Sequence, residues 1–317
     1  MPERLVVSLP NDLLRPYLEK LADPVPAGVE FVTWAIDGPP PEPRIDIAVQ
    51  PYMSADPSRF RWLAEGEVGL VQSQSIGYDG VAAALPPGLV YANASSVHET
   101  ATAELALALI LASQRGLDVF ARNAEHGLWK GGRRPSLADR MILILGYGGV
   151  GKAIEARLAG FEVGQVVRVA SRARADAAGE VQDPVHIHGI GELPTLLPQT
   201  DIVVIGTPLT AATRGLVGAA ELALLPDDAL VVNVARGPVL DTAAVLAEVG
   251  RLRFALDVTD PEPLPADHPL WSAPGVLISP HVGGAASAME PRMARLLRRQ
   301  IGHLLAGEEP ENVVLRS

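Results

Sequence analysis

The sequence predicts an α/β protein made of two doubly wound parallel-sheet domains. Short apolar runs recur along the 317 residues, and helical or turn-like segments separate most of them. The runs are apolar throughout rather than alternating, which is typical of parallel strands covered on both faces. A chain of this length exceeds a typical single core and suits two domains.

The first hundred residues supply the strands of a smaller domain. The candidate strands there are residues 4–9, 29–34, 45–50, 68–73 and 89–93. Residues 99–113 then form the clearest helix, because this segment is rich in alanine and leucine and carries acids near its start.

A second series of strands indicates a larger domain. These candidate strands are residues 141–146, 165–170, 201–207, 229–235, 252–258 and 275–280. A last helix at 287–305 lies beyond the final strand, from where it can return to the first domain. We therefore expect one domain from residues 1–97 and 287–317, with a second domain of residues 98–286 inserted in it.

Composition limits the classes of partner. A net charge of −11 argues against a nucleic-acid surface and against binding to anionic lipid. The chain has no cysteine, which excludes a disulfide framework, a thiolate nucleophile and a cysteine-ligated metal. The apolar run near the N-terminus is too short for a secretory signal, and residues 105–113 reach about half the length of a membrane span. We expect a cytoplasmic protein with no membrane partner.

A glycine loop follows the first strand of the second series. Gly146, Gly148 and Gly151 have G-x-G-x-x-G spacing between an apolar strand and a helix. The first glycine allows a tight turn, the second lets the backbone approach a pyrophosphate, and the third allows close packing of helix on strand. A glycine-rich turn without a ligand is the alternative. The predicted cofactor-binding residues of this loop are Gly146, Tyr147, Gly148, Gly149, Val150 and Gly151.

The end of the next strand bears on the choice of cofactor. Dinucleotide sites for NAD carry an acid there that binds the ribose 2′-hydroxyl, but this chain has Ala170 and Ser171. Arg172 follows, with Arg168 and Arg174 nearby, and a guanidinium could bind a 2′-phosphate. The residues therefore favour NADP(H), with Ser171 and Arg172 in the site, while NAD(H) remains possible. A solvated basic turn is the alternative.

Three further segments sit where strands should end. They are "NVARGPVLD" (233–241), "DVTDPEP" (257–263) and "SPHVGG" (279–284). Ligands of open α/β sheets bind outside the carboxyl ends of the strands, so Arg236, Asp257, Glu262 and His281 could share one cleft. Taken singly, such an Arg, Glu or His is more often a surface ion pair, a rigid turn or a packed side chain.

The order of these motifs resembles the D-isomer-specific 2-hydroxyacid dehydrogenase family, in its glyoxylate/hydroxypyruvate reductase-like branch. The resemblance extends to "TPLTAATRGLV" (207–217) and "SIGYD" (75–79) and so covers nearly the whole chain. It implies a Rossmann-type cofactor domain inserted in a flavodoxin-like substrate domain, with catalysis in a cleft closed by a hinge. The implied reaction is reversible hydride transfer between NAD(P)H and a small 2-keto acid, giving the D-hydroxy acid.

The resemblance implies a catalytic set of Arg236, Glu262 and His281. A guanidinium can bind the carboxylate or carbonyl of a 2-keto acid through paired donors. Hydride arriving at the carbonyl carbon leaves negative charge on oxygen, and histidine suits the supply of the proton. Glu262, held between Pro261 and Pro263, would orient His281 and stabilise its protonated form.

The same resemblance assigns binding residues. Asp257 matches the residue that contacts the nicotinamide carboxamide, although it could merely cap the strand end. The other implied cofactor contacts are Thr207, Pro208, Val234, Ala235, Arg236, His281 and Gly283. Substrate carboxylate would be bound by backbone N–H groups of Ser75, Ile76 and Gly77, together with Arg236 and His281, unless residues 75–77 form a plain strand-to-helix turn.

Several alternatives remain open at this level. A phosphoglycerate dehydrogenase-like enzyme is the runner-up, and a dinucleotide-sensing corepressor would share the fold and cofactor without turnover. The sequence "HIH" (186–188) places two imidazoles on one strand face, but no third ligand is apparent, so we expect no metal site and a solvated strand. The broadly apolar helix at 99–113 suggests a homodimer.

Overall fold

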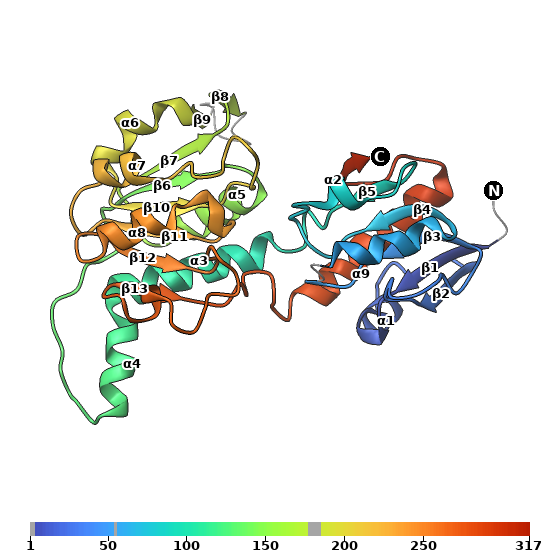
Figure 1. Cartoon of the computed structure of the whole chain (residues 1–317), viewed down its shortest axis with the longest axis horizontal. Coiled ribbons are helices and arrows are strands. Elements are labelled where there is room, and N and C mark those ends of the chain that lie inside the picture. The colour runs from blue at the N-terminus through green and yellow to red at the C-terminus, as the bar shows by residue number, and fades with distance from the viewer. Residues whose placement is uncertain (1–3, 54–55, 177–184) are drawn as a thin grey trace. The chain divides into compact units, whose positions relative to one another are not determined.

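A computed structural model describes residues 4–53, 56–176 and 185–317. The chain divides into two compact units (Figure 1). The first unit comprises Met1–His98 and Gly284–Ser317, and the second unit comprises Glu99–Gly283. That the first unit binds substrate and the second unit binds cofactor is a prediction from the sequence.

The first unit is built on a mostly parallel sheet. Its strands are β1 (Leu5–Leu9), β2 (Val29–Thr33), β3 (Arg44–Val49), β4 (Glu67–Gln72), β5 (Val90–Ala92) and β14 (Val313–Arg316). They lie in the order β14-β5-β4-β3-β1-β2, and only β14 is antiparallel to its neighbour. Without β14 this is the 2-1-3-4-5 order of the flavodoxin-like fold.

Both faces of this sheet are covered. One face packs against α9 (Met289–Ala306), α1 (Arg15–Glu19) and the short 3₁₀ turn η1 (Asp12–Leu14), where Val7 lies in one cluster with Leu297. The other face packs against η2 (Pro57–Ala64) and α2 (Val81–Ala84), where Val6 lies in one cluster with Phe60. Adjacent residues of β1 therefore point into opposite layers, which explains why the strand is apolar throughout.

The second unit contains a larger sheet. Its strands are β6 (Met141–Leu145), β7 (Gln165–Ala170), β8 (Arg174–Asp176), β9 (Val185–Gly189), β10 (Ile202–Ile205), β11 (Leu230–Asn233), β12 (Arg253–Leu256) and β13 (Val276–Ile278). Their order is β13-β12-β11-β10-β6-β7-β9-β8, and all neighbours are parallel except β8 and β9. The strand order reverses between β6 and β10, which is where ligands of such sheets bind. The predicted fold class is confirmed.

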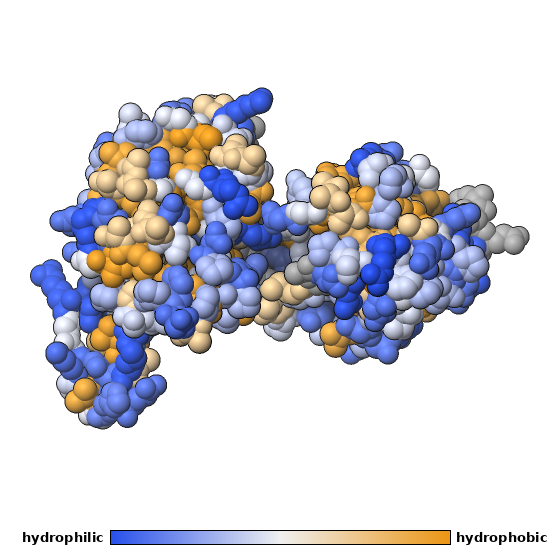
Figure 2. Space-filling model, viewed as in Figure 1, coloured by the Kyte–Doolittle hydropathy of each residue, from blue (hydrophilic) through white to orange (hydrophobic). Residues whose placement is uncertain are grey.

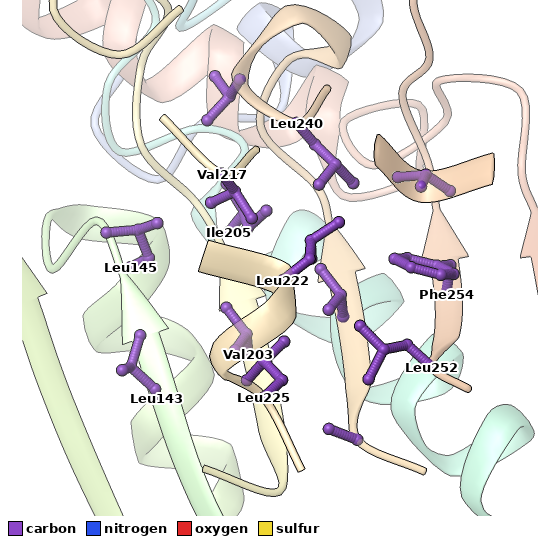
Figure 3. Packing of buried hydrophobic residues seen from close by; sticks show 14 of the residues in the cluster. Leu143, Leu145, Val203, Ile205, Val217, Leu222, Leu225, Leu240, Leu252 and Phe254 are labelled. Atoms are coloured by element: carbon purple, nitrogen blue, oxygen red, sulfur yellow. The ribbon is translucent and has the colours of Figure 1, made fainter. Parts of the chain in front are cut away.

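Helices cover both faces of this second sheet. On one face lie α3 (Glu99–Arg115) and α5 (Gly149–Leu158), and on the other lie α6 (Leu193–Leu196), α7 (Ala219–Leu224) and α8 (Thr242–Glu248). Figure 3 shows Leu222 of α7 and Leu225, which directly follows the helix, in one cluster with Val203 and Ile205 of β10. Helix α4 (Leu117–Glu125) follows α3, and short 3₁₀ turns complete the unit: η3 (Ile190–Glu192), η4 (Leu197–Gln199), η5 (Gly237–Val239) and η6 (Pro269–Ser272).

Helix α3 uses much of its apolar surface inside its own unit. Ala103, Ala106 and Ile110 are fully buried in the cluster that contains Ile142 and Ile144 of β6. This packing accounts for part of the broad apolar surface that suggested a dimer. Among the described helices, none combines the length and hydropathy needed to cross a membrane.

Candidate active site

The predicted motifs of the second unit follow one row of paired residues across its sheet. The residues of this row lie at or near the carboxyl ends of their strands, and each is paired with the next one across the sheet. In order they are Val169, Leu145, Ile205, Asn233, Leu256 and Ile278. The motif segments begin within two residues after this row. Parallel pairing therefore brings the glycine loop and the segments carrying Arg236, Asp257 and His281 to one edge of the sheet.

The glycine loop has the geometry that a dinucleotide needs. Gly146 has φ +106°, and a Cβ there would lie 2.5 Å from the Thr207 nitrogen. A Cβ on Gly151 would lie 2.4 Å from the Gly146 oxygen, so a helix with any larger residue could not pack on β6. Gly148, by contrast, has open space within 4 Å of its Cβ position and immediately precedes α5. The loop thus leaves room for an anion at the helix N-terminus and fits a dinucleotide pyrophosphate.

Three arginines lie in β7, after β7 and in β8, and they differ in their hydrogen-bond and ion-pair partners. Arg168 is ion-paired with Glu155, and Arg174 is paired with Asp176 at 2.8 Å while also donating to the Tyr147 carbonyl at 3.2 Å. Ser171 and Arg172 are exposed. Within the described part of the chain Arg172 makes no hydrogen bond or ion pair, so its guanidinium is the one most available to a ligand.

His281 and Glu262 are hydrogen-bonded to each other. Nδ1 of the imidazole faces Oε1 of the carboxylate, and the two side chains are 27% and 38% exposed. The carboxylate accepts, so Nδ1 carries the proton. Nε2 has no hydrogen-bond partner in residues 4–53, 56–176 and 185–317. This ring nitrogen can therefore exchange a proton with a bound ligand while Glu262 fixes the orientation of the ring.

Electrostatics keep Glu262 ionised. Partial burial alone would raise its pKa. The hydrogen bond from His281, the charge of His281, the backbone N–H of Thr259 and the charge of Arg236 together outweigh burial, so the pKa of Glu262 lies below its ordinary value. The electrostatic effect of Arg236 on Glu262 brings the third predicted catalytic residue into the same region as the pair.

Gly237 explains how the loops of Arg236 and Glu262 come close together. A Cβ on Gly237 would lie 1.8 Å from the Thr259 carbonyl oxygen, a distance that no side chain can accommodate. The buried Asn233, to which the sequence analysis gave no role, donates to the Arg236 carbonyl and accepts from the Ala235 nitrogen, each at 3.0 Å. The position of Asn233 at the end of β11 is the sequence feature that could have indicated this role.

Asp257 holds the loop that carries His281. One carboxylate oxygen accepts from Ser279 Oγ at 2.7 Å and from the Val282 nitrogen at 2.9 Å, and the other accepts from the Gly283 nitrogen at 2.9 Å. His281 itself has φ +52° and donates its N–H to the Asp257 carbonyl at 2.7 Å. The buried carboxylate thus fixes an unusual backbone turn at His281.

The remaining predicted cofactor contacts also follow strand ends. Thr207 and Pro208 come after β10, and Val234 and Ala235 come directly after β11. The last two are buried, so they could offer a ligand little beyond their main chain. Gly283 lies close to the Asp257 carboxylate, since a Cβ there would be 3.0 Å from Oδ2.

Ser75, Ile76 and Gly77 belong to the first unit, in the loop that follows β4. The Ser75 N–H already donates to Ser73 Oγ at 3.0 Å, whereas the described residues include no acceptor for the N–H groups of Ile76 and Gly77. His98, whose place after β5 made it a candidate for the lining of the cleft, supports this loop. It is buried, and its ring nitrogens lie 2.6 Å from the Gln74 carbonyl oxygen and 3.2 Å from the Gly284 carbonyl oxygen.

Comparison with known proteins identifies the family. Residues 107–283 match the model of the D-isomer specific 2-hydroxyacid dehydrogenase NAD-binding domain. The chain is 32% identical to a glyoxylate reductase of Thermofilum pendens, over 77% of this chain and 74% of that one. It is 33% identical to glyoxylate/hydroxypyruvate reductase B of Pectobacterium atrosepticum, over 76% and 77% of the two chains.

A solved structure extends the similarity to nearly the full length. It is a D-isomer specific 2-hydroxyacid dehydrogenase from Xanthobacter autotrophicus in complex with NADPH and MES, 27% identical, with a TM-score of 0.76 over 98% of each chain. With the strand-end site described above, these similarities show that the chain belongs to the D-isomer-specific 2-hydroxyacid dehydrogenases, oxidoreductases that transfer hydride between a nicotinamide cofactor and a 2-keto or 2-hydroxy acid.

Proposed function

We propose that this enzyme reduces a small 2-keto acid of the glyoxylate or hydroxypyruvate type, with NADPH as the preferred cofactor and Arg236, Glu262 and His281 as its catalytic residues. The hydrogen bond between His281 and Glu262 carries the proposal, because it leaves Nε2 of His281 as a positioned proton donor. The names of the relatives that match over three quarters of the chain support the substrate class.

Each residue has one task in this mechanism. Arg236 binds the keto acid through paired, charge-assisted hydrogen bonds, and its side chain is half-buried, which limits competition from water. When bound, the nicotinamide supplies the hydride that converts the carbonyl to an alkoxide. His281 gives its Nε2 proton to that oxygen, and Glu262 stabilises the imidazolium before the transfer. The N–H groups of Ile76 and Gly77 are suited to bind the substrate carboxylate.

The substrate assignment is tested by NADPH oxidation with a panel of 2-keto acids. The panel contains glyoxylate, hydroxypyruvate, pyruvate, a bulkier 2-keto acid and 3-phosphohydroxypyruvate. The proposal expects the highest kcat/KM for one of the first two. Preference for the phosphorylated acid would favour a phosphoglycerate dehydrogenase-like enzyme, and cofactor binding without turnover on any acid would favour a dinucleotide sensor.

The preference for NADPH rests on Arg172. No acid follows β7 to hold the ribose hydroxyls, and Arg172 is exposed and uncommitted while Arg168 and Arg174 have carboxylate partners. The relative solved with NADPH supports the same cofactor. One charge-assisted interaction with a 2′-phosphate contributes on the order of 1.5–3 kcal/mol, equivalent to roughly a tenfold to hundredfold preference.

Arg172→Ala measures this contribution. We expect the variant to have a raised KM for NADPH and a nearly unchanged KM for NADH in steady-state assays. Arg174→Ala is the matched control, because its guanidinium is already bound to Asp176. A native enzyme that binds NADH as tightly as NADPH would show that these arginines form only a solvated turn.

A homodimer and a cytoplasmic location complete the proposal, and both rest on the sequence. Exposed apolar side chains at the start of α4 and just beyond its end add support for a dimer, since Leu117, Leu128 and Trp129 are all more than half exposed.

A further inference from the structure

A cluster of two imidazoles and a carboxylate lies on β9 and the turn that follows it. Strand alternation places His186 and His188 on one face, and Glu192 ends the 3₁₀ turn η3. One ligand atom from each residue lies within 4.8 Å of the others. The two rings are 4.3 Å apart between centroids, and Nδ1 of His188 is 2.7 Å from Oε2 of Glu192. No third donor beside "HIH" is apparent in the sequence, and in the folded chain Glu192 supplies a carboxylate next to His188.

The surrounding backbone holds the three donors in place. β9 lies between β7 and β8, and His188 is paired with Val169 of β7 while His186 is paired with Ala175 of β8, so a neighbouring strand holds the backbone of each histidine. Oε1 of Glu192 accepts from the Gly189 nitrogen at 2.8 Å, which leaves Oε2 directed at the imidazoles. The cross-strand neighbour of His186 is Ala175, whose small side chain leaves room beside the ring and adds no competing charge.

We propose that His186, His188 and Glu192 bind a divalent transition-metal ion of the Zn²⁺ class. Two nitrogen ligands and one carboxylate oxygen suit Zn²⁺, whereas Mg²⁺ and Ca²⁺ prefer sites made of oxygen alone. Three protein ligands leave a fourth position for solvent, and the exposure of His186 allows it.

Binding changes the hydrogen bond that now joins two of the ligands. His188 must release its Nδ1 proton so that the lone pair can face the ion beside Glu192, and the proton leaves to solvent. The ion would act structurally, since it would tie β9 to η3 and none of the proposed catalytic residues belongs to the cluster. Its position is next to the cofactor segment, because a Cβ on Gly189 would lie 3.2 Å from the Ala173 nitrogen.

The chain contains a matched control cluster. His303 on α9 is 2.8 Å from Glu308 and 3.2 Å from Glu311, so it also combines imidazole and carboxylates. It offers a single imidazole, and Glu311 is bound by Arg299 at 2.9 Å. Arg299 already neutralises one of its carboxylates, so this cluster should bind the ion far more weakly.

The test is calorimetric titration of the metal-stripped full chain with ZnCl₂, paired with thermal unfolding. We expect saturable binding of one Zn²⁺ per chain, a raised Tm and no response to MgCl₂. His186→Ala should weaken binding by at least about tenfold, the lower end of what loss of a supporting partner alone costs. Glu192→Gln should also weaken it while still accepting from the Gly189 N–H, which keeps the turn folded. His303→Ala should bind as the native chain does.

Each contrary result overturns the proposal. Absence of saturable Zn²⁺ binding would show that the cluster binds no metal ion and that His188 and Glu192 form only a structural hydrogen bond. Binding that survives His186→Ala and Glu192→Gln, or that disappears in His303→Ala, would place the ion elsewhere. Circular dichroism of each variant checks that the fold is retained, and none of these readouts depends on turnover.

Discussion

At Glu262 burial and charge act on the pKa in opposite directions. Partial burial disfavours its ionised form, but the hydrogen bond from His281, together with the charges of His281 and Arg236, favours it and lowers its pKa. A carboxyl with a lowered pKa in the folded state stabilises the fold above its unfolded pKa. That contribution is lost as the pH falls through the lowered pKa.

Glu262→Gln should expose this contribution. We expect the variant to have a lower Tm than the native chain near neutral pH, and the difference should shrink as the pH falls from about 7 to about 3. Thermal unfolding across that range measures it. Glu104→Gln, an exposed change on α3, is the control and should show no such trend. A difference that stays constant with pH would mean that the charge of Glu262 contributes nothing to stability.

At the residue scale, positions in motifs could be predicted from the sequence, whereas the partners of a side chain could not. Arg236, Glu262 and His281 could be chosen because each stands in a motif after a predicted strand. The position of Arg172 directly after the strand could be read from the sequence, but the carboxylate partners of Arg168 and Arg174 could not, because Glu155 and Asp176 reach these arginines only in the folded chain. Likewise Glu192 becomes a neighbour of His188 only through the 3₁₀ turn between them.

Among elements, the glycine loop with α5 has the clearest division of labour. Gly146 and Gly151 are required by close backbone contacts inside the unit, whereas Gly148 borders open space. Gly146 and Gly151 are therefore needed for the fold, and Gly148 leaves space in which a ligand can bind.

Gly148→Ala should separate these roles. Its φ of −102° suits alanine, so we expect an unchanged Tm. A methyl group where the backbone must approach the pyrophosphate should weaken NADPH binding by at least about tenfold, or about 1.4 kcal/mol. Fluorescence titration with NADPH measures the affinity. Gly160→Ala, also in open space, should leave binding unchanged. If Gly148→Ala and the native chain bind NADPH with equal affinity, the assignment of this loop as the dinucleotide-binding site is wrong.

The elements themselves were largely predictable. The strands β6 and β10 are apolar at every position because both faces of their sheet are covered, and that leaves a strong signal in the sequence. Strand β8 was missed, since "RAD" (174–176) has exposed or half-buried side chains and owes its conformation to pairing with β9. The expected strand "HIH" is present within β9 (Val185–Gly189).

At the scale of the whole molecule, the apolar side chains that stay exposed on one chain bear on the assembly of two copies. The dimer was predicted from α3, but α3 buries much of its apolar surface within its own unit. Apolar side chains around α4 provide another surface, and Trp129 is fully exposed. In Figure 2 small hydrophobic patches lie among hydrophilic residues in this region. An exposed tryptophan beside leucines is typical of an interface.

Light scattering tests the dimer. We expect twice the chain mass at micromolar concentrations, and Leu128→Asp should shift the mass toward one chain. Leu13 is an exposed leucine of the first unit, and Leu13→Asp should remain dimeric. A native chain that has the mass of a monomer throughout the micromolar range would refute the prediction.

The most direct measurement of the central claim is turnover by His281→Ala, with NADPH and the best 2-keto acid, beside the native enzyme. Loss of the proton donor should lower kcat by about two to four orders of magnitude, the range typical of general acid–base catalysis. The dissociation constant of NADPH should hardly change, because the proton is delivered to the substrate oxygen. A variant that keeps near-native turnover would contradict the assignment of His281 as the proton donor and the mechanism built on it.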